Sequence, residues 1–373
     1  MDSLVDLESL GWDDFFERSF GSYRQRQYVP GRISQQHRGI YQIFTACGEL
    51  SARLSGRLRH RAGPGQLPAA GDWVAIRPRY DEASATIAGV LGRKSQFVRA
   101  AAGNKTEGQV VAANVDTVFL MTALNNDFNV RRIERYLVLA WESGSQPVVL
   151  LSKSDLCGDP ERKLLEVEAV AMGAPVHVTS VIDGTGLQAL GRYLGPGKTV
   201  ALLGSSGVGK STLINYLAGR ELQKTRDVRT QDGRGRHTTT SRQLIILPGG
   251  GLVLDTPGMR ELQLWDGQDE AAGGDLGSAC TSGFARTFSD IESLAEQCRY
   301  GDCSHNGEPD CAVQAGLAEG GLDRARFRSY EKLRKELRYQ ERKQDKAAEI
   351  REKNKWKKLC RAAREKAAIK RRG

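Results

Sequence analysis

The sequence has no apolar run that approaches the roughly 20 residues needed to cross a bilayer, and its mean hydropathy is −0.45. Its N-terminus, MDSLVDLESLGWDDFF, is acidic and lacks the basic region that opens a secretory signal. The first absence excludes a membrane-spanning helix, and the second argues against export. We therefore expect a cytoplasmic protein that has no membrane partner and functions as a monomer.

Cysteine is also scarce, with seven in 373 residues, and their clustering favours a reduced compartment with a metal site over the alternative, a disulfide framework. Three of them share the stretch CRYGDCSHNGEPDC with one histidine. The four candidate ligands offer three thiolates and one imidazole, the closed tetrahedral set of a structural rather than catalytic zinc site. They are Cys298, Cys303, His305 and Cys311. The alternative is a group of free buried thiols. Four cysteines are isolated and are interpreted as ordinary thiols: Cys47, Cys157, Cys280 and Cys360.

Acidic residues are outnumbered by basic residues chiefly near the C-terminus. The chain carries a net charge of +10, but the segment from Asp323 to Gly373 has 21 Lys and Arg against 8 Asp and Glu, a local charge of +13 that leaves −3 for the remainder. Such a segment suits a polyanionic partner, although a solvated helical face has the same composition.

Residues 1–102 read as an extension followed by a barrel. Residues 1–27 are mixed in composition, and we expect this N-terminal extension to be only partly ordered. Residues 28–102 contain short strand-like runs such as AAGDWVAIRPRY, punctuated by Gly and Pro. This pattern predicts a small β-barrel. Five short strands suit an OB-fold, although periodicity alone does not separate it from an SH3-like barrel.

Longer apolar runs follow, including VDTVFLMTAL, QPVVLLSKSD and KTVALLGSS, with helix-like segments between them. Alternating buried strands and helices predict a doubly wound, mostly parallel α/β sheet over residues 103–275. The cysteine-containing segment, residues 276–325, is expected to form a zinc-binding domain. Residues 326–373 are expected to form a basic tail that is helical or disordered.

The stretch GSSGVGKST is a complete phosphate-loop pattern between a strand-like TVALLG and a helix-like STLINYLAG. Backbone N–H groups of such a loop cradle phosphate oxygens at a helix N-terminus, the lysine reaches the β- and γ-phosphates, and the hydroxyl after it ligates Mg²⁺. A chance glycine-rich turn is the competing interpretation. The predicted nucleotide contacts are Gly204, Ser205, Ser206, Gly207, Val208, Gly209, Lys210, Ser211 and Thr212.

The other γ-phosphate elements follow downstream. In GLVLDTPG, Asp255 ends a strand, where it can hold Mg²⁺ through water, and Gly258 can offer its N–H to the γ-phosphate. The polar loop RTQDGRGRHTTTSRQL lies between them and the phosphate loop. We predict that Thr239 in this loop ligates Mg²⁺ only in the GTP state, which makes a switch. Alternatively, its threonines only begin a strand.

The base-reading residues lie upstream of the phosphate loop. In PVVLLSKSDL, Asp155 can accept from the guanine edge, while the stem of Lys153 can pack along the ring and Ser152 occupies the first position of the motif. Ser180 lies where the next base-contacting loop belongs. The motif order is therefore circularly permuted, which a sheet tolerates if its original termini were close together.

This order, with NVRRIERYL, GRGRHTTT, DTPGMREL and the cysteine cluster, resembles the RsgA (YjeQ/YloQ) family of circularly permuted GTPases over roughly residues 28–320. The resemblance implies an N-terminal OB-fold, a permuted GTPase domain and a C-terminal zinc domain. It implies GTP and GDP as ligands, with Mg²⁺, and GTP hydrolysis stimulated by the small ribosomal subunit late in its maturation. The RNA partner would be the subunit's rRNA.

Two positions depart from the usual GTPase pattern. Ser152 stands where Asn or Thr begins the base-reading motif, which predicts weaker guanine affinity. Met259 stands where many GTPases carry a water-orienting glutamine, so intrinsic hydrolysis should be slow, and His237 is the best remaining candidate to position water. These departures favour an alternative function: an RNA-binding module with a weak guanine-nucleotide sensor and little turnover. Asp155 argues against an ATPase or small-molecule kinase.

Overall fold

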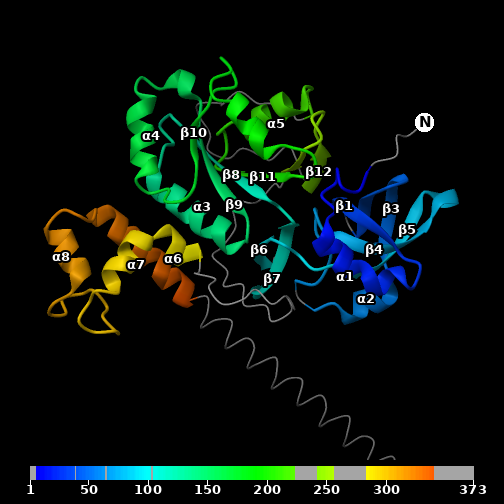
Figure 1. Ribbon diagram of the computed structural model, residues 1–373, viewed down its shortest axis with the longest axis horizontal. Coiled ribbons are helices and arrows are strands. Elements are labelled where there is room, and N and C mark those ends of the chain that lie inside the picture. The colour runs from blue at the N-terminus through cyan, green and yellow to red at the C-terminus, as the bar shows by residue number, and fades with distance from the viewer. Residues whose placement is uncertain are drawn as a thin grey trace, which may run out of the picture.

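The computed structural model describes residues 6–37, 39–63, 65–101, 104–222, 242–255 and 283–339. Figure 1 shows three parts: a barrel built from the N-terminal strands, a central sheet flanked by helices, and a smaller helical module near the C-terminus. Among the helices of these ranges, none has both the length and the apolar character needed to cross a membrane.

The N-terminal part is a closed five-stranded barrel. Its strands are β1 (Val29–His37), β2 (Ile40–Thr45), β3 (Gly48–Leu54), β4 (Trp73–Arg79) and β5 (Ser84–Val90), with α2 (Gly56–Arg61) and η1 (Tyr80–Glu82) in the connections. They pair in the order β1-β2-β3-β5-β4, and β4 closes back on β1. Alternate residues of these strands, among them Ile33, Ile43 and Ile87, fill the interior. The barrel of five short strands confirms the OB-fold expectation.

The N-terminal extension is more ordered than expected. Helix α1 (Asp14–Arg24) begins at Asp13, whose carboxylate accepts a hydrogen bond from the Phe15 N–H. Phe16 and Phe20, one helical turn apart, are buried, and the Phe16 ring lies 5.8 Å from the ring of Trp73 on β4. The helix is therefore anchored by aromatic burial against the barrel, which composition alone did not reveal.

Strands β6 (Gln96–Ala101) and β7 (Asn104–Ala113) pair antiparallel in a separate two-stranded sheet. The boundary predicted at residue 102 falls between these two strands. In Figure 1 they lie between the barrel and the central sheet. The limits of the individual domains stay predictions.

The central sheet is doubly wound. Its six strands run in the order β10-β9-β8-β11-β13-β12, and the first five are parallel. The strands are β8 (Thr117–Ala123), β9 (Gln146–Ser152), β10 (Val176–Val178), β11 (Thr199–Gly204), β12 (Arg242–Ile246) and β13 (Leu252–Asp255). Every residue of β8, and of β11, is buried, as expected for strands covered on both faces.

Two helical layers cover this sheet. One face packs against α3 (Val130–Glu142) and α4 (Pro160–Glu168), and the other against α5 (Lys210–Ala218) and η3 (Gln188–Tyr193). The short η2 (Ser154–Leu156) follows β9. The strand with the base-reading residues, β9, precedes the phosphate-loop strand, β11, which is the permuted order expected from the sequence.

Sheet and barrel are continuous. Strand β12 pairs antiparallel with β1 of the barrel through Gln243 and Gln35. Beside this junction, the buried guanidinium of Arg32 donates to the carbonyl oxygens of Leu10 and Asn114 and to Thr199 Oγ1 at the start of β11. Burial lowers the pKa of Arg32 to about 10. The Arg32 side chain thus joins the extension, the barrel and the phosphate-loop strand.

The C-terminal module contains α6 (Gly283–Thr287), α7 (Ser289–Ala295), α8 (Ala312–Ala318) and a helix over residues 324–339. Its core rings, Phe284, Phe288 and Tyr330, lie within 5.5 Å of one another, and this core is continuous with residues of α3. The predicted helical start of the tail is confirmed up to residue 339. The remainder of the tail lies outside the described residues.

Candidate nucleotide and metal sites

The predicted nucleotide residues gather at one edge of the central sheet. Because β8, β9, β10, β11 and β13 are parallel, their carboxyl ends meet at this edge, and ligands of open α/β sheets bind there. The phosphate loop follows β11, the base-reading motif follows β9, Ser180 follows β10, and Asp255 ends β13. Segments that are distant in sequence are thereby brought together as predicted.

The phosphate loop turns sharply from β11 into α5. Gly207 and Gly209 have φ angles of +77° and +96°, which favour glycine. Gly204 passes so close to β8 that an added Cβ would lie 2.5 Å from the carbonyl oxygen of Met121. The loop's N–H groups and the α5 N-terminus together provide an anion-binding cradle.

Lys210 opens α5 and folds back over the loop. Its Nζ donates to the carbonyl oxygens of Gly204 at 2.8 Å and Ser205 at 2.7 Å. Ser211 and Thr212 follow in the first helical turn and are half-buried, whereas Ser206 at the loop tip is exposed. The ammonium group therefore lies along the loop, the place required for a cation that meets phosphate oxygens.

Ser152 has a role that the sequence did not reveal. Its hydroxyl is buried at the end of β9 and donates to the carbonyl oxygen of Val208 in the phosphate loop, at 2.7 Å. It also lies 3.2 Å from the carbonyl oxygen of Thr122 on β8. The short side chain of Ser152 thus links the base-reading loop to the phosphate loop by a hydrogen bond. The affinity loss expected from the absence of Asn stays a prediction.

Asp155 and Ser180 are direct partners. The Ser180 hydroxyl donates to Asp155 Oδ1 at 2.7 Å and accepts from the Ile182 N–H at 3.2 Å. Asp155 is exposed at the sheet edge, and Lys153 before it adopts a left-handed φ of +60°. The serine thus orients a carboxylate that remains accessible to the base.

Asp255 is the last residue of β13, adjacent to β11 in the sheet. The other γ-phosphate candidates, Thr239, His237 and Gly258, lie outside the described residues, as does Met259. Their proposed roles rest on the sequence alone.

Sequence reasoning missed a polar cluster behind the phosphate loop. Asp127 Oδ2 accepts from Arg132 Nη1 at 2.7 Å and from the Ser205 hydroxyl at 2.5 Å. The hydrogen bond from Arg132 is the main cause of a lowered pKa of Asp127, which keeps this carboxylate charged. NVRRIERYL contains Arg132, but nothing in its pattern shows a contact with a loop more than seventy residues away.

The cysteine cluster has the dimensions of a tetrahedral site. The ligand atoms of Cys298, Cys303, His305 and Cys311 all lie within 4.8 Å of one another. Cys298 Sγ lies 3.8 Å from Cys311 Sγ, and His305 Nδ1 lies 3.6 and 3.5 Å from these two sulfurs. Zn–S bonds of about 2.3 Å give tetrahedral edges of about 3.8 Å. The four side chains therefore fit a metal ion.

Glu308 organises the loop that carries His305. Its carboxylate accepts from the Ser304 N–H at 2.9 Å and the Asn306 N–H at 2.7 Å, and also from the Ser304 hydroxyl. These hydrogen bonds lower the pKa of Glu308 to about 2. His305 itself has a left-handed φ of +62°, so the loop presents its ring in a conformation that Glu308 helps to hold.

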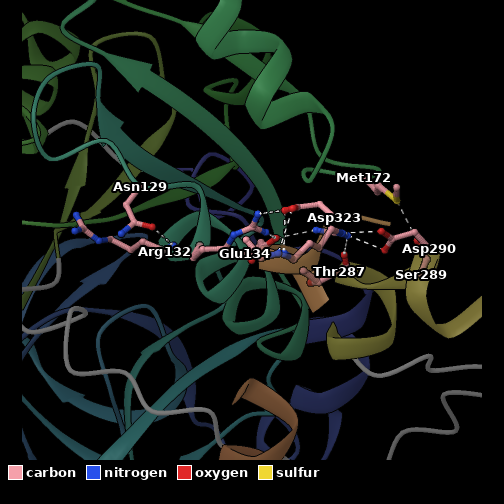
Figure 2. Close-up of polar contacts among 11 residues, drawn as sticks. Asn129, Arg132, Glu134, Met172, Thr287, Ser289, Asp290 and Asp323 are labelled. Atoms are coloured by element: carbon pink, nitrogen blue, oxygen red, sulfur yellow. Dashed lines mark hydrogen bonds and ion pairs between the residues drawn. The ribbon is translucent and has the colours of Figure 1, made fainter. Parts of the chain in front are cut away.

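A buried ionic network attaches the C-terminal module to α3 (Figure 2). Glu134 on α3 is fully buried and accepts from Arg326 Nη1 at 3.0 Å and from Arg131 Nη1 at 2.5 Å. Arg326 also donates to both carboxylate oxygens of Asp290, at 2.6 and 2.8 Å. Arg131 reaches Asp323 at the start of the final described helix. The network fixes the module against the central domain.

Comparison with known proteins gives a consistent result. A family model described as RsgA GTPase matches residues 90–265. A protein from Opitutus terrae, named small ribosomal subunit biogenesis GTPase RsgA, is 46% identical over 98% of this chain and 99% of its own length. The crystal structure of YjeQ from Thermotoga maritima has a TM-score of 0.60 and 28% identity, covering 83% of this chain and 98% of that one. YloQ, described as a circularly permuted GTPase, supports the fold with a TM-score of 0.58 at 24% identity, covering 84% and 96% of the two chains.

Proposed function

This chain belongs to the RsgA GTPase family, and we propose that it couples GTP hydrolysis to late maturation of the small ribosomal subunit. The observation that carries the proposal is the hydrogen bond from Ser152 to the Val208 carbonyl, because it joins a base-reading loop and a phosphate loop into one site across a permuted chain. The name of the Opitutus terrae relative supports the same function.

GTP would lie along the carboxyl edge of the sheet. Asp155, oriented by Ser180, accepts hydrogen bonds from the guanine edge, which adenine does not supply, and the stem of Lys153 packs along the ring. The loop from Gly204 to Thr212 surrounds the phosphates, and Lys210 neutralises charge on the β- and γ-phosphates.

Magnesium fits the hydroxyl and carboxylate groups at this edge. Ser211 and Thr239 would be its ligands and Asp255 would hold it through water, and the bound ion would supply positive charge against the phosphates. Thr239 contributes only in the GTP state, and Gly258 donates its N–H to the γ-phosphate. With Met259 unable to orient water, we assign that role to His237.

The cysteine cluster would hold one structural zinc ion. Three thiolates and one imidazole complete the tetrahedron, so no coordination position remains for substrate. Zinc here stabilises the loop that Glu308 organises and takes no part in hydrolysis.

The proposed partner is the small ribosomal subunit with its rRNA, bound by a monomer in the cytoplasm. The barrel and the C-terminal module provide shape, and the basic residues from Asp323 onward provide charge for the phosphate backbone. Because Met259 cannot orient water, intrinsic hydrolysis would be slow, and binding to the subunit would stimulate it.

Equilibrium binding tests this proposal. Purified small subunits, large subunits and naked ribosomal RNA would each be sedimented with the protein, in GDP or in a non-hydrolysable GTP analogue. We expect the tightest binding to small subunits in the GTP analogue. Equal binding to both subunits, or no difference between the nucleotides, would overturn the proposed partner or the proposed switch, respectively.

A further inference from the structure

Asp127, Arg132 and Ser205 form a polar cluster behind the phosphate loop in which every pair of side chains is in contact. Arg132 Nη1 donates to Asp127 Oδ2 at 2.7 Å and lies 3.1 Å from Ser205 Oγ, whose hydroxyl donates to the same carboxylate oxygen at 2.5 Å. Each of the three groups thus contacts the other two. A group of this kind restrains the Ser205 side chain more than any single hydrogen bond would.

Ser205, together with Gly204, also helps to hold the Lys210 side chain. Its carbonyl oxygen accepts from Lys210 Nζ at 2.7 Å, and its side chain is the part held by Asp127 and Arg132. A displacement of Ser205 therefore moves the carbonyl that aims the phosphate-binding ammonium.

Arg132 is itself fixed by a rigid helix. Asn129 caps α3 by accepting from the Arg132 N–H at 3.2 Å. Further along α3, Glu134 is bound to Arg326 of the C-terminal module at 3.0 Å. Figure 2 shows Arg132 extending away from that network, so one helix is held by the module through Glu134 and holds the phosphate loop through Arg132.

The pair adds little to folding stability. The side chains of Arg132 and Asp127 are 29% and 41% exposed, and ion pairs at such positions contribute little to the free energy of unfolding. The pair can nevertheless affect the rate of hydrolysis, because catalysis is sensitive to small displacements of the groups that contact the phosphates.

We propose that Arg132 is a positioning residue for GTP hydrolysis: with Asp127 it holds Ser205, and thereby keeps Lys210 aimed at the β- and γ-phosphates. The inference rests on the proposed function, since it assigns a role within the same nucleotide site. Arg132 acts through Asp127 and Ser205 and need not touch the nucleotide.

The test uses the full-length protein without ribosomes and measures two quantities. One is the single-turnover rate of GTP hydrolysis, and the other is the ratio of GDP affinity to guanosine affinity, which isolates the phosphate contacts. For Arg132→Ala we expect the rate to fall about 10- to 100-fold. The affinity ratio should fall about tenfold through weaker GDP binding, with guanosine affinity and thermal midpoint unchanged.

Matched variants sharpen the result. Arg132→Lys keeps the charge but not the planar fork and should recover part of both quantities. Asp127→Asn combined with Arg132→Ala should be no worse than the more damaging single change, because the residues act as one unit. Arg162→Ala is the control, because Arg162 is an exposed arginine paired with Glu166 on α4. This change should affect neither quantity.

Unchanged rate and affinity ratio in Arg132→Ala would overturn the proposal. A matching loss of guanosine affinity and thermal midpoint would also overturn it, because it would show general destabilisation. If the wild-type protein hydrolysed no GTP, the proposed function would fail, and the affinity ratio would still decide the role of Arg132.

Discussion

Asp155 is the residue on which we expect nucleotide selection to depend. It lies exposed at the carboxyl edge of the sheet, with one oxygen held at 2.7 Å by the Ser180 hydroxyl. A fixed carboxylate presents acceptors only, which matches the two donors on the guanine edge and leaves adenine without complementary groups.

Changing Asp155 to Asn should leave the phosphate contacts intact but place a donor against the guanine donors. Because a hydrogen-bonding site rejects a partner that leaves its polar groups unpaired, GTP affinity should fall by roughly 10⁴-fold. Titration of wild type and variant with a fluorescent, non-hydrolysable GTP derivative would measure this. Glu168→Gln, an exposed change on the same domain, is the control, and equal affinity in all three proteins would remove Asp155 from the role.

The contacts of Ser152 and Arg132 with the phosphate loop could not be predicted from the sequence. Gly204, Lys210 and Ser211 were predictable because the phosphate loop is a local pattern whose residue spacing follows from its own backbone. The hydrogen bond from Ser152 to Val208, and that of Ser205 to Asp127, join segments separated by 56 and 78 residues. Such contacts depend on strand order and register, which the pattern of a single segment does not contain.

At the scale of elements, the parallel strands and the metal loop were predictable and the N-terminal helix was not. Continuous apolar runs identified β8, β9 and β11, and ligand spacing identified the cysteine cluster. Helix α1 escaped because only Phe16 and Phe20 are fully buried among its mostly polar residues. Its place on the barrel depends on Trp73, a residue of a distant strand.

The loop that carries His305 and Glu308 should depend on bound zinc for its fold. Cys303→Ser should release about one equivalent of zinc and unfold the loop around Glu308, because metal binding in such modules is largely folding free energy. Metal analysis and limited proteolysis would follow this, with Cys47→Ser as the matched control. The sheet face that packs against α5 and the phosphate loop has a core separate from the module, so GDP affinity should persist. Wild-type protein that contains no zinc would refute the metal assignment.

The attachment of the C-terminal module should depend on charge pairing. Arg326→Met leaves the fully buried carboxylate of Glu134 with Arg131 alone, and should lower the free energy of unfolding by about 3 kcal/mol. Urea unfolding followed by circular dichroism would measure it. Adding Glu134→Leu should restore much of the loss, since apolar pairs can replace buried ion pairs.

The exposed pair of Arg299 and Asp310 provides the contrast. These side chains are 60% and 69% exposed, so Arg299→Ala should change the free energy of unfolding by about 0–1 kcal/mol. If Arg299→Ala and Arg326→Met were equally damaging, burial of the Glu134 network would not explain the attachment.

At the scale of the whole molecule, one continuous structure connects the parts proposed to meet RNA with the part proposed to bind GTP. Strand β12, which begins three residues after Thr239 in the sequence, pairs with β1 of the barrel. Helix α3 joins the phosphate loop to the C-terminal module through Arg132 and Glu134. Binding at either end can therefore influence the nucleotide site through contacts of the described residues.

The basic tail should contribute to the binding of the whole protein to the small subunit. Deleting residues from Lys343 onward should weaken binding to small subunits at moderate salt and flatten the salt dependence. The log–log slope should become shallower by about 0.7 for each single-strand phosphate that the protein no longer neutralises. Binding measured across a salt series would show this, and GDP affinity should not change. A truncated protein with the wild-type affinity and slope would identify the tail as a solvated appendage.

Activation of this GTPase by the small ribosomal subunit is best tested by single-turnover hydrolysis of GTP. The rate would be measured alone, with small subunits and with large subunits, with Lys210→Ala as the inactive control. We expect a slow intrinsic rate that rises with small subunits only, and no hydrolysis by the Lys210→Ala protein. A wild-type rate that is the same with and without small subunits would contradict it and favour a nucleotide-sensing RNA-binding protein.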